Sequence, residues 1–398
     1  PGATNLMTGV ADALLDCSPL VAITGQTDLS KTHKQAHQYI DIREMFRPIT
    51  KWNSRITRPE AIPEIVRWAF KVAQAEKPGA THLELSEDVA AADVTGEPIE
   101  PTPVSYPAPN AEGVFQAARL IEQAAYPMII AGNGVIRRRA SAELAALAKK
   151  VHLAVTNTFM GKGCVDYNES YALPTVGMHQ RDWVMCGLER ADLIITVGYD
   201  QVEYEPCLWN PDKNKKIIHI DTLPSDVDEH YLPQVEIVGE IRQSLAALAE
   251  ACDFTRDYAG LSSLREFLLG ELEQYSHDKS VPLKPQKVLA DLRQVLNPDD
   301  ILLTDVGAHK VWAARMYPAR SPNSVIISNG FASMGFALPG AIAAKLVYPE
   351  RRVVALCGDG GFLMSSHELE TAKRLGLAFV VVIWVDNSYG LIEWKQMN

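Results

Sequence analysis

Two acidic turns near the C-terminal end of the sequence have residue types and a spacing that suit a divalent cation and a phosphate group. The turn Gly358–Gly361 (Gly-Asp-Gly-Gly) follows the apolar run Val353–Cys357, and Asp386 follows a second apolar run, Phe379–Val385. Asp359 and Asp386 are 27 positions apart, so one strand–helix–strand unit can place their carboxylates at corresponding ends of two parallel strands. Carboxylates combined with substrate phosphate usually hold Mg²⁺ in proteins. The alternative is an ordinary pair of strand ends with solvated aspartates.

The segment between these turns predicts the helix of such a unit. Ser365 and Glu368 have the Ser-x-x-Glu form of a capping box, and apolar residues then recur at helical spacing until Gly376. Both flanking runs are continuously apolar, which is typical of parallel strands buried on both faces. Glycines in the first turn would let a phosphate approach the backbone, where the start of the helix offers amide donors.

Composition narrows the class of protein. A length of 398 residues predicts two or three domains, and 47% apolar with 22% charged residues is ordinary for a globular protein. The net charge of −11 argues against a nucleic-acid partner, and the basic run Arg137–Arg139 is interpreted as a solvated helix start. The six cysteines form no Cys-x-x-Cys pair, which indicates free thiols and a cytoplasmic location. No run approaches the ~20 apolar residues of a membrane helix.

The motifs resemble a known enzyme family. Gly-Asp-Gly-Gly-Phe followed by a polar turn at this spacing resembles the thiamine diphosphate signature, and Ile327–Ala372 resembles acetolactate synthases. Within that family, Trp384–Asn387 resembles the catabolic, butanediol-pathway branch. The resemblance covers essentially the whole sequence. It implies an α/β fold of three doubly wound parallel-sheet domains, which bind the pyrimidine ring, form a central layer and bind the diphosphate.

The resemblance also implies the domain boundaries. The pyrimidine-binding domain is expected in residues 1–92 and a proline-rich linker in 93–110. A central Rossmann-like domain follows in 111–255, a second linker in 256–283, and the diphosphate- and Mg²⁺-binding domain in 284–398. The N-terminal part of the first domain and the C-terminal part of the last are expected to lie outside this sequence.

Site residues follow from the resemblance, position by position. It assigns Mg²⁺ to Asp359, Asp386 and the carbonyl of Ser388, with Asn387 as the rival of Asp386. Met334, 25 positions before Asp359, matches the large apolar residue that supports the bent cofactor; simple packing is the alternative. Residues 305–309 match a turn that contacts the diphosphate side of the cofactor, with an ordinary strand-to-helix turn as the alternative. The cofactor-binding residues implied are Pro1, Asn5, Val306, Gly307, Ala308, His309, Met334, Gly358, Gly360, Gly361 and Leu391.

The implied catalytic residue is Gln38, which matches a family glutamine that borders the substrate. The glutamate that activates the cofactor in the family lies upstream of the Pro1–Asn5 motif and is not expected in this sequence. Neither Glu44 nor Glu87 matches its motif.

The central domain is expected to lack a nucleotide. Gly132-x-Gly134 lacks the third glycine of a dinucleotide fingerprint. Biosynthetic members of the family hold FAD in this domain, but the segment Val202–Pro206 (VEYEP) resembles the flavin-free branch, so FAD is not expected. Gly177-Met178-His179 matches a family segment near the substrate, with core packing as the alternative.

The reaction implied is the condensation of two pyruvates to 2-acetolactate with release of CO₂, through a hydroxyethyl-thiamine diphosphate intermediate. Another thiamine diphosphate decarboxylase or carboligase, a non-catalytic remnant of the family, and a flavin- or NAD-dependent oxidoreductase are the competing interpretations. The expected partners are a 2-oxo acid and further copies of the chain, in a homodimer or homotetramer with active sites at the subunit interface. Neither a nucleic acid nor a membrane is expected as a partner.

Overall fold

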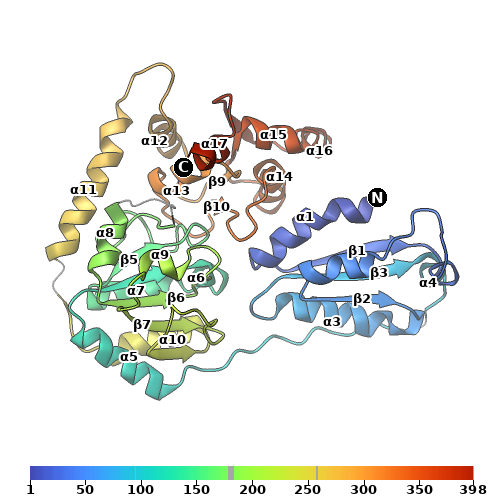
Figure 1. Ribbon diagram of the computed structural model, residues 1–398, viewed down its shortest axis with the longest axis horizontal. Coiled ribbons are helices and arrows are strands. Elements are labelled where there is room, and N and C mark those ends of the chain that lie inside the picture. Colours follow the sequence, from blue (N-terminus) through green and yellow to red (C-terminus); the bar gives the residue numbers. More distant parts are fainter. Residues whose placement is uncertain (95, 178–182, 257–258, 398) are drawn as a thin grey trace. The chain divides into compact units, whose positions relative to one another are not determined.

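The computed structural model describes residues 1–94, 96–177, 183–256 and 259–397, and these form two compact units (Figure 1). The first unit consists of Pro1–Ser105 with Gly330–Ser333, and the second of Tyr106–Asn329 with Met334–Asn398. Within the described residues the strands form three parallel sheets, one in the first unit and two in the second. Helices cover these sheets, so the predicted α/β class is confirmed.

The first unit is a three-stranded sheet with helices on both faces. Helices α1 and α2 pack on one face, where Val10 and Phe46 are buried, and α3 packs on the other face around Ala69 and Leu83. The strands have the order β1-β3-β2, and the elements are α1 (Gly2–Leu15), β1 (Leu20–Gln26), η1 (Leu29–Lys31), α2 (Ile42–Phe46), η2 (Arg47–Ile49), β2 (Trp52–Ile56), η3 (Pro59–Ala61), α3 (Ile62–Gln74), β3 (Ala80–Ser86) and α4 (Glu87–Ala90).

The central sheet of the second unit is the most buried, because every residue of β4, β5 and β6 is buried. Helices α5, α7 and α10 cover one face, and α8, α9 and α11 cover the other. The strand order is β5-β4-β6-β7-β8. The elements are α5 (Ala111–Gln123), β4 (Pro127–Ala131), α6 (Asn133–Arg137), α7 (Ser141–Val151), β5 (Ala154–Asn157), α8 (Trp183–Arg190), β6 (Leu193–Val197), α9 (Pro206–Trp209), β7 (Lys216–Asp221), β8 (Val235–Val238), α10 (Ile241–Ala251) and α11 (Ala259–Ser276).

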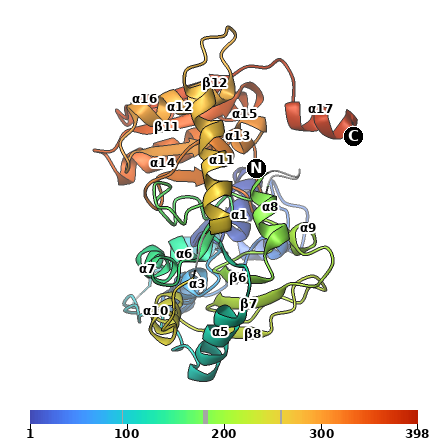
Figure 2. The same cartoon turned by 90° about the vertical axis from the view of Figure 1, so that its left-hand side faces the viewer.

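The third sheet, also in the second unit, contains both acidic turns. Helices α12 and α13 pack on one face and α14 on the other, while α11 runs along α8 and α12 and so joins the central and third sheets (Figure 2). The strand order is β10-β9-β11-β12. The elements are α12 (Pro285–Val295), β9 (Ile301–Thr304), α13 (Ala308–Met316), β10 (Val325–Ile327), α14 (Ala337–Val347), β11 (Val353–Gly358), α15 (Asp359–Ser365), α16 (Glu368–Arg374), β12 (Val380–Trp384) and α17 (Gly390–Met397).

Two local predictions for the third sheet are wrong. The helix begins at Asp359 rather than at Ser365, because Gly358 is extended and the chain turns into α15 directly after it. Ser365 therefore ends α15, and α16 begins after His367 without a side-chain cap. The strand β12 is at the edge of the sheet, and its side chains are exposed or half-buried rather than buried on both faces.

The basic run of the central domain also differs from its prediction. Arg137 ends α6 instead of starting a helix, and it forms an ion pair with Asp200 at 3.0 Å. Arg138 pairs with Glu240 at 3.2 Å. The two guanidinium groups thus hold the loops after β6 and β8 next to α6.

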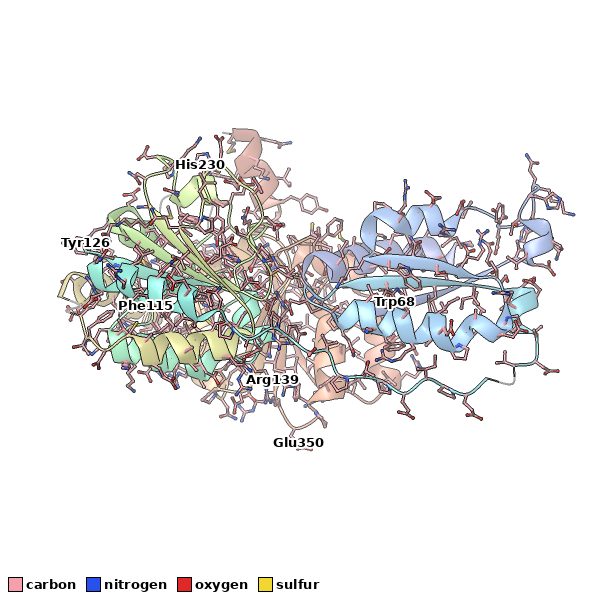
Figure 3. All side chains as sticks on the ribbon, turned by 90° about the horizontal axis from the view of Figure 1, so that it is seen from below. Trp68, Phe115, Tyr126, Arg139, His230 and Glu350 are labelled. Atoms are coloured by element: carbon pink, nitrogen blue, oxygen red, sulfur yellow. The ribbon has the colours of Figure 1, made fainter. Side chains whose placement is uncertain are left out.

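Exposed aromatic side chains are paired with nearby cations. Figure 3 shows Trp68, Phe115 and Tyr126 on the outside of their units, where they are 49%, 56% and 43% exposed. Lys71, Arg119 and Arg190 lie over these three rings, 6.0, 5.9 and 4.0 Å from the ring centres in that order. Such contacts are worth about 0.5–1 kcal/mol at exposed positions.

None of the described helices is long and apolar enough to cross a membrane.

Candidate cofactor site

The pairing of the third sheet brings its turns to one edge. Thr304 of β9 pairs with Leu356 of β11, and Gly358 of β11 pairs with Trp384 of β12. Asp359 directly follows β11, and Asp386 follows β12 after one intervening residue. Because all four strands are parallel, the turns after them open on the same side of the sheet. The arrangement predicted from the two apolar runs is present.

The two carboxylates are each fixed by a local hydrogen bond and share one neighbour. The amide of Gly360 donates to Asp359 Oδ1 at 2.8 Å, and the amide of Ser388 donates to Asp386 Oδ1 at 3.2 Å. Both carboxylates act electrostatically on the imidazole of His309. Among the described residues, no group of three or more His, Cys, Asp or Glu side chains converges as a metal site. A cation here would therefore need these two carboxylates together with oxygens from the backbone and the ligand.

Asn387 has a backbone role of its own. It is in the left-handed region with φ +59°, a conformation that asparagine tolerates better than most residues. The backbone conformation alone therefore explains an asparagine at this position, without a role in metal binding. The side chain of Asp386 points toward Gly390, and its Oδ2 lies 3.2 Å from where a Cβ on that glycine would lie.

His309 provides a buried polar atom that suits a bound ligand. The side chain is 5% exposed, and its Nε2 has no hydrogen-bond partner among the described residues. Burial lowers the pKa of His309 to about 4, so the imidazole is neutral at pH 7. Its ring lies against Gly358 and is edge-on to Trp384, with 6.4 Å between ring centres. A neutral imidazole beside two carboxylates can donate to or accept from a phosphate-bearing ligand, so these residues fit a diphosphate cofactor with its cation.

The glycines at this edge have close neighbours. Gly307 has φ +155°, and a Cβ there would lie 2.8 Å from the His309 ring. A Cβ at Gly361 would lie 2.9 Å from the carboxyl carbon of Asp305, and one at Gly360 would lie 2.6 Å from the ring of Tyr389. Any larger residue would have to displace these neighbours, so the glycines keep the turn narrow as well as open to a ligand.

Met334 lies in the turn before α14. It is half-exposed and is not part of the buried clusters of the third sheet. The support of the cofactor by Met334 stays a prediction, with simple packing as its alternative. The following residue, Gly335, has φ +88° and donates its amide to Asp305 Oδ1 at 2.9 Å.

Asp305 begins the turn 305–309 that the resemblance assigned to the diphosphate side, but it was not among the predicted cofactor-binding residues. It is fully buried, and its Oδ1 accepts from the amides of Val306 and Gly335 at 2.7 and 2.9 Å. Burial raises the pKa of Asp305, an effect that these backbone hydrogen bonds oppose. The only signal in the sequence was an acidic residue directly after an apolar strand, and it does not reveal which amides the carboxylate would reach.

Sequence-predicted residues of the first unit line a pocket of about 1010 Å³. Pro1 and Gln38 are both at its wall, together with the buried Gln26, whose amide donates to the carbonyl of Ile40 at 3.0 Å. Gln38 is in the left-handed region with φ +56°. Asn5 does not line this pocket and is exposed on α1. The pocket opens at the carboxyl ends of β1 and β3, where a parallel sheet places ligands.

The charges around this pocket were not predicted. Lys31, Lys34 and His37 line it from the loop after β1, and Glu87 lines it from the start of α4. The three basic side chains are exposed. The two lysines outnumber Glu87 among the charged side chains of the wall, which suits a small carboxylate ligand.

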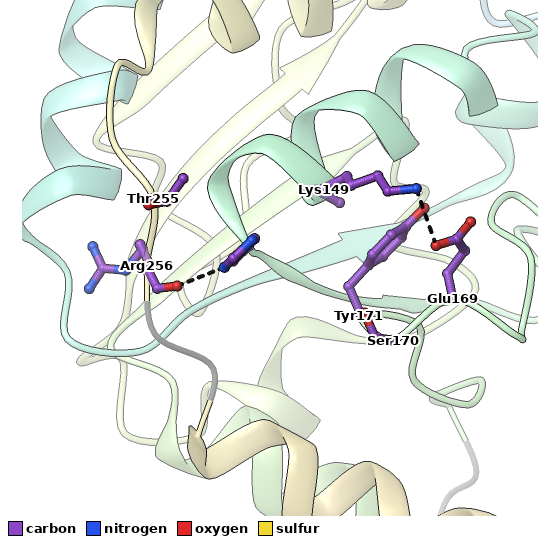
Figure 4. A pocket seen from close by; sticks show the side chains of 8 residues that line it. Lys149, Glu169, Ser170, Tyr171, Thr255 and Arg256 are labelled. Carbon is purple, nitrogen blue, oxygen red and sulfur yellow. Dashed lines mark hydrogen bonds and ion pairs between the residues drawn. The ribbon is translucent and has the colours of Figure 1, made fainter.

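A second cavity, of about 720 Å³, lies in the central domain (Figure 4). Lys149 faces Glu169 at 3.9 Å, and His152 Nδ1 is hydrogen bonded to the carbonyl of Arg256 at 2.9 Å. The predicted site residues do not line this cavity. Met178 and His179 of the predicted substrate segment lie outside the described residues.

Comparisons with known proteins agree with this geometry. Sequence models of thiamine pyrophosphate enzymes match the chain in three places: the N-terminal TPP binding domain at residues 1–45, the central domain at 114–248 and the C-terminal TPP binding domain at 305–398. A probable acetolactate synthase large subunit of Methanocaldococcus jannaschii is 36% identical over 100% of this chain and 70% of that protein. The chain belongs to the acetolactate synthase family of thiamine pyrophosphate enzymes.

Other relatives in the acetolactate synthase family carry related names. The acetolactate synthase of Bacillus subtilis is 33% identical over the whole of this chain and 71% of its own length. The catabolic acetolactate synthase of Raoultella terrigena is 34% identical over the whole of this chain and 72% of its own length. The three matched regions each lie in one of the predicted domains, whose boundaries remain predictions.

In the central domain of this acetolactate synthase family member, the loops after β4 and β6 lie close together at their glycines. A Cβ at Gly132 would lie 2.2 Å from the carbonyl oxygen of Gly198, and one at Gly134 would lie 2.5 Å from the Gly198 Cα. The amide of Gly134 donates to the Gly198 carbonyl at 2.9 Å. These glycines therefore allow the loops after β4 and β6 to contact each other closely.

We expect Gly361→Ala to lower stability and weaken cofactor binding. Alanine normally favours a helix over glycine by about 1 kcal/mol, but in α15 the new methyl group would meet the Asp305 carboxylate. Overpacking of this kind costs ~1–3 kcal/mol. Gly270→Ala in α11 is the matched control, since no atom lies within 4 Å of its Cβ position. The measurement is the thermal midpoint of each variant. A midpoint of Gly361→Ala that rises like that of Gly270→Ala would contradict the packing argument.

Proposed function

We propose that the protein is a thiamine diphosphate-dependent acetolactate synthase that condenses two pyruvates to 2-acetolactate and releases CO₂. The observation that carries this proposal is the edge of the third sheet, where the turns with His309, Asp359 and Asp386 open on the same side and both carboxylates act electrostatically on the imidazole. The similarity to acetolactate synthases over the whole chain supports the same reaction.

Asp359, Asp386 and the carbonyl of Ser388 are proposed to hold Mg²⁺. Two carboxylates and one carbonyl leave coordination positions for diphosphate oxygens and water, which is the usual arrangement for this ion. His309 is neutral at pH 7 because burial lowers its pKa to about 4, so it adds no competing positive charge. When bound, thiamine diphosphate supplies the electron sink for decarboxylation.

The pocket of the first unit is proposed to serve the substrate side. Gln38 can donate hydrogen bonds from its amide to a carbonyl or carboxylate oxygen of a 2-oxo acid. Lys31 and Lys34 line the same pocket, where they outnumber Glu87, and favour an anionic substrate. Pyruvate meets both requirements, since it has a keto group and a carboxylate on adjacent carbons.

The closer assignments remain part of this proposal. Trp384–Asn387 and Val202–Pro206 support the catabolic branch, and with it acetoin and butanediol metabolism rather than branched-chain amino acid synthesis. We propose a cytoplasmic homodimer or homotetramer with active sites at subunit interfaces, as the resemblance implies. A nucleic-acid partner is not proposed, because the net charge is −11.

The reaction itself is tested by product analysis. The complete protein, purified and supplied with pyruvate, Mg²⁺ and thiamine diphosphate, is expected to form one 2-acetolactate and one CO₂ for every two pyruvates consumed. Chiral chromatography or proton NMR identifies the product. Acetaldehyde as the main product would instead indicate a 2-oxo acid decarboxylase, and no turnover with bound cofactor would favour a non-catalytic member of the family.

We expect Asp359→Ala and Asp386→Ala each to abolish Mg²⁺-dependent binding of thiamine diphosphate in titration calorimetry. Removing a direct ligand should cost more than the roughly 10–100-fold loss typical of an outer-shell partner. Asp299→Ala is a suitable control, because Asp299 is an exposed acid in the same domain. Unchanged cofactor affinity in Asp359→Ala or in Asp386→Ala would contradict the assignment of that residue as a metal ligand.

The purified protein is expected to carry no flavin. The motive is the segment Val202–Pro206, which stands where the biosynthetic branch has its arginine-rich flavin segment and resembles the flavin-free branch. Visible absorbance of the purified protein and the response of activity to added FAD measure this. A stoichiometric flavin band would move the protein to the biosynthetic branch.

A further inference from the structure

One buried carboxylate connects several turns at the edge of the third sheet where the strands end, called the cofactor edge below. Asp305 follows β9 and is fully buried, and its Oδ1 accepts from two amides that are 29 positions apart in the chain, those of Val306 and Gly335. The amides of Phe336 and Ala337, at the start of α14, also act on its carboxylate. The carboxylate thus connects the turn after β9 to the turn before α14.

The same carboxylate forms one wall of the glycine turn. A Cβ on Gly361 would lie 2.9 Å from the carboxyl carbon of Asp305, so the turn after β11 approaches Asp305 as closely as glycine permits. Its Oδ2 has no hydrogen-bond partner among the described residues. Asp305 therefore contacts the turn before His309, the turn after Met334 and the turn that contains Asp359.

We propose that Asp305 is a positioning residue that holds these three turns in the arrangement required to bind thiamine diphosphate with its cation. The proposal rests on the proposed function, because it assumes that the cofactor binds at this edge. Its role is to accept backbone amides at fixed positions. An oxygen in the place of Oδ1 is then the essential feature, and the negative charge is not.

Asp300 offers a matched control at the opposite end of the same strand. It is 4% exposed, and its carboxylate accepts from the amides of Asn297 and Arg352 at 2.7 and 3.0 Å. It precedes β9, whereas Asp305 follows it. The two aspartates therefore have similar burial and the same number of these amide bonds, but only Asp305 is at the cofactor edge.

The test compares Asp305→Ala, Asp305→Asn and Asp300→Ala in the complete protein. The dissociation constant of thiamine diphosphate at saturating Mg²⁺ is measured by titration calorimetry, and thermal midpoints are measured without cofactor. We expect Asp305→Ala to weaken binding about tenfold or more, the equivalent of about 1.4 kcal/mol. Asp305→Asn keeps an accepting oxygen and should stay within about threefold of the wild type. Asp300→Ala should lose thermal stability with an unchanged dissociation constant.

Each outcome decides between this inference and a general structural role. Equal weakening by Asp305→Ala and Asp300→Ala, or wild-type affinity in Asp305→Ala, would overturn the inference while leaving the proposed function intact. If Asp305→Ala does not fold, Asp305→Ser replaces it, since its shorter side chain cannot reach both amides; wild-type affinity in that variant would also overturn the inference. A wild-type protein without affinity for the cofactor would overturn the inference and the proposed function together.

Discussion

The structure depends on a property of parallel sheets, in which all strands end at the same edge. Residues far apart in the sequence meet there without any long-range side-chain attraction, because the backbone ladder sets their level. Pairing of Thr304 with Leu356 and of Gly358 with Trp384 fixes where Asp305, Asp359 and Asp386 lie. Slipping this ladder by one residue would turn every side chain of a strand to the opposite face. The buried residues of β9 and β11 make such a slip costly. The positions of the turns that follow these strands are therefore fixed as well.

Strands with a continuous apolar run could be predicted from the sequence, whereas strands without such a run could not. The apolar run Val353–Cys357 lies within β11, because burial on both faces leaves an uninterrupted apolar pattern, and the run Phe379–Val385 contains the edge strand β12. The strand β2 (Trp52–Ile56) contains Asn53, Ser54 and Arg55 and is half-buried, so its pattern carries no such signal. The strand β10 has only three residues. The capping box failed for another reason: its pattern is local, whereas the start of α15 is set by the end of β11.

The same distinction separates the site residues that could be predicted from those that could not. A glycine turn and an acidic turn after two apolar strands can be recognised from spacing, and both lie at the predicted edge. Asp305 could not be recognised, because its importance comes from the amides of Gly335 and the α14 start, which reach it only in the folded chain. The cations around the pocket of the first unit, such as Lys31 and Lys34, were missed because exposed lysines in a loop resemble an ordinary solvated surface. The cofactor signature is thus local, while the residues that position and accompany it are not.

Helix α13 shows how the central domain contributes to the cofactor edge. Its first turn carries His309, and near its other end the carbonyl of Ala314 accepts from the ammonium of Lys162, a 3% exposed residue of the central domain, at 2.7 Å. A cation at a helix C-terminus is favourable, yet burial, with Arg315 nearby, lowers the pKa of Lys162 to about 7. Because its ordinary pKa is 10.5, the unfolded chain binds more protons above pH 7, and this group's contribution to stability rises from there toward pH 10. Lys310 of α13 lies over the ring of Phe159, 5.5 Å from its centre. Two contacts therefore attach α13 to the central domain, that of Lys162 with Ala314 and that of Lys310 with Phe159. They help to position His309 in the first turn of the helix, although no cofactor motif contains them.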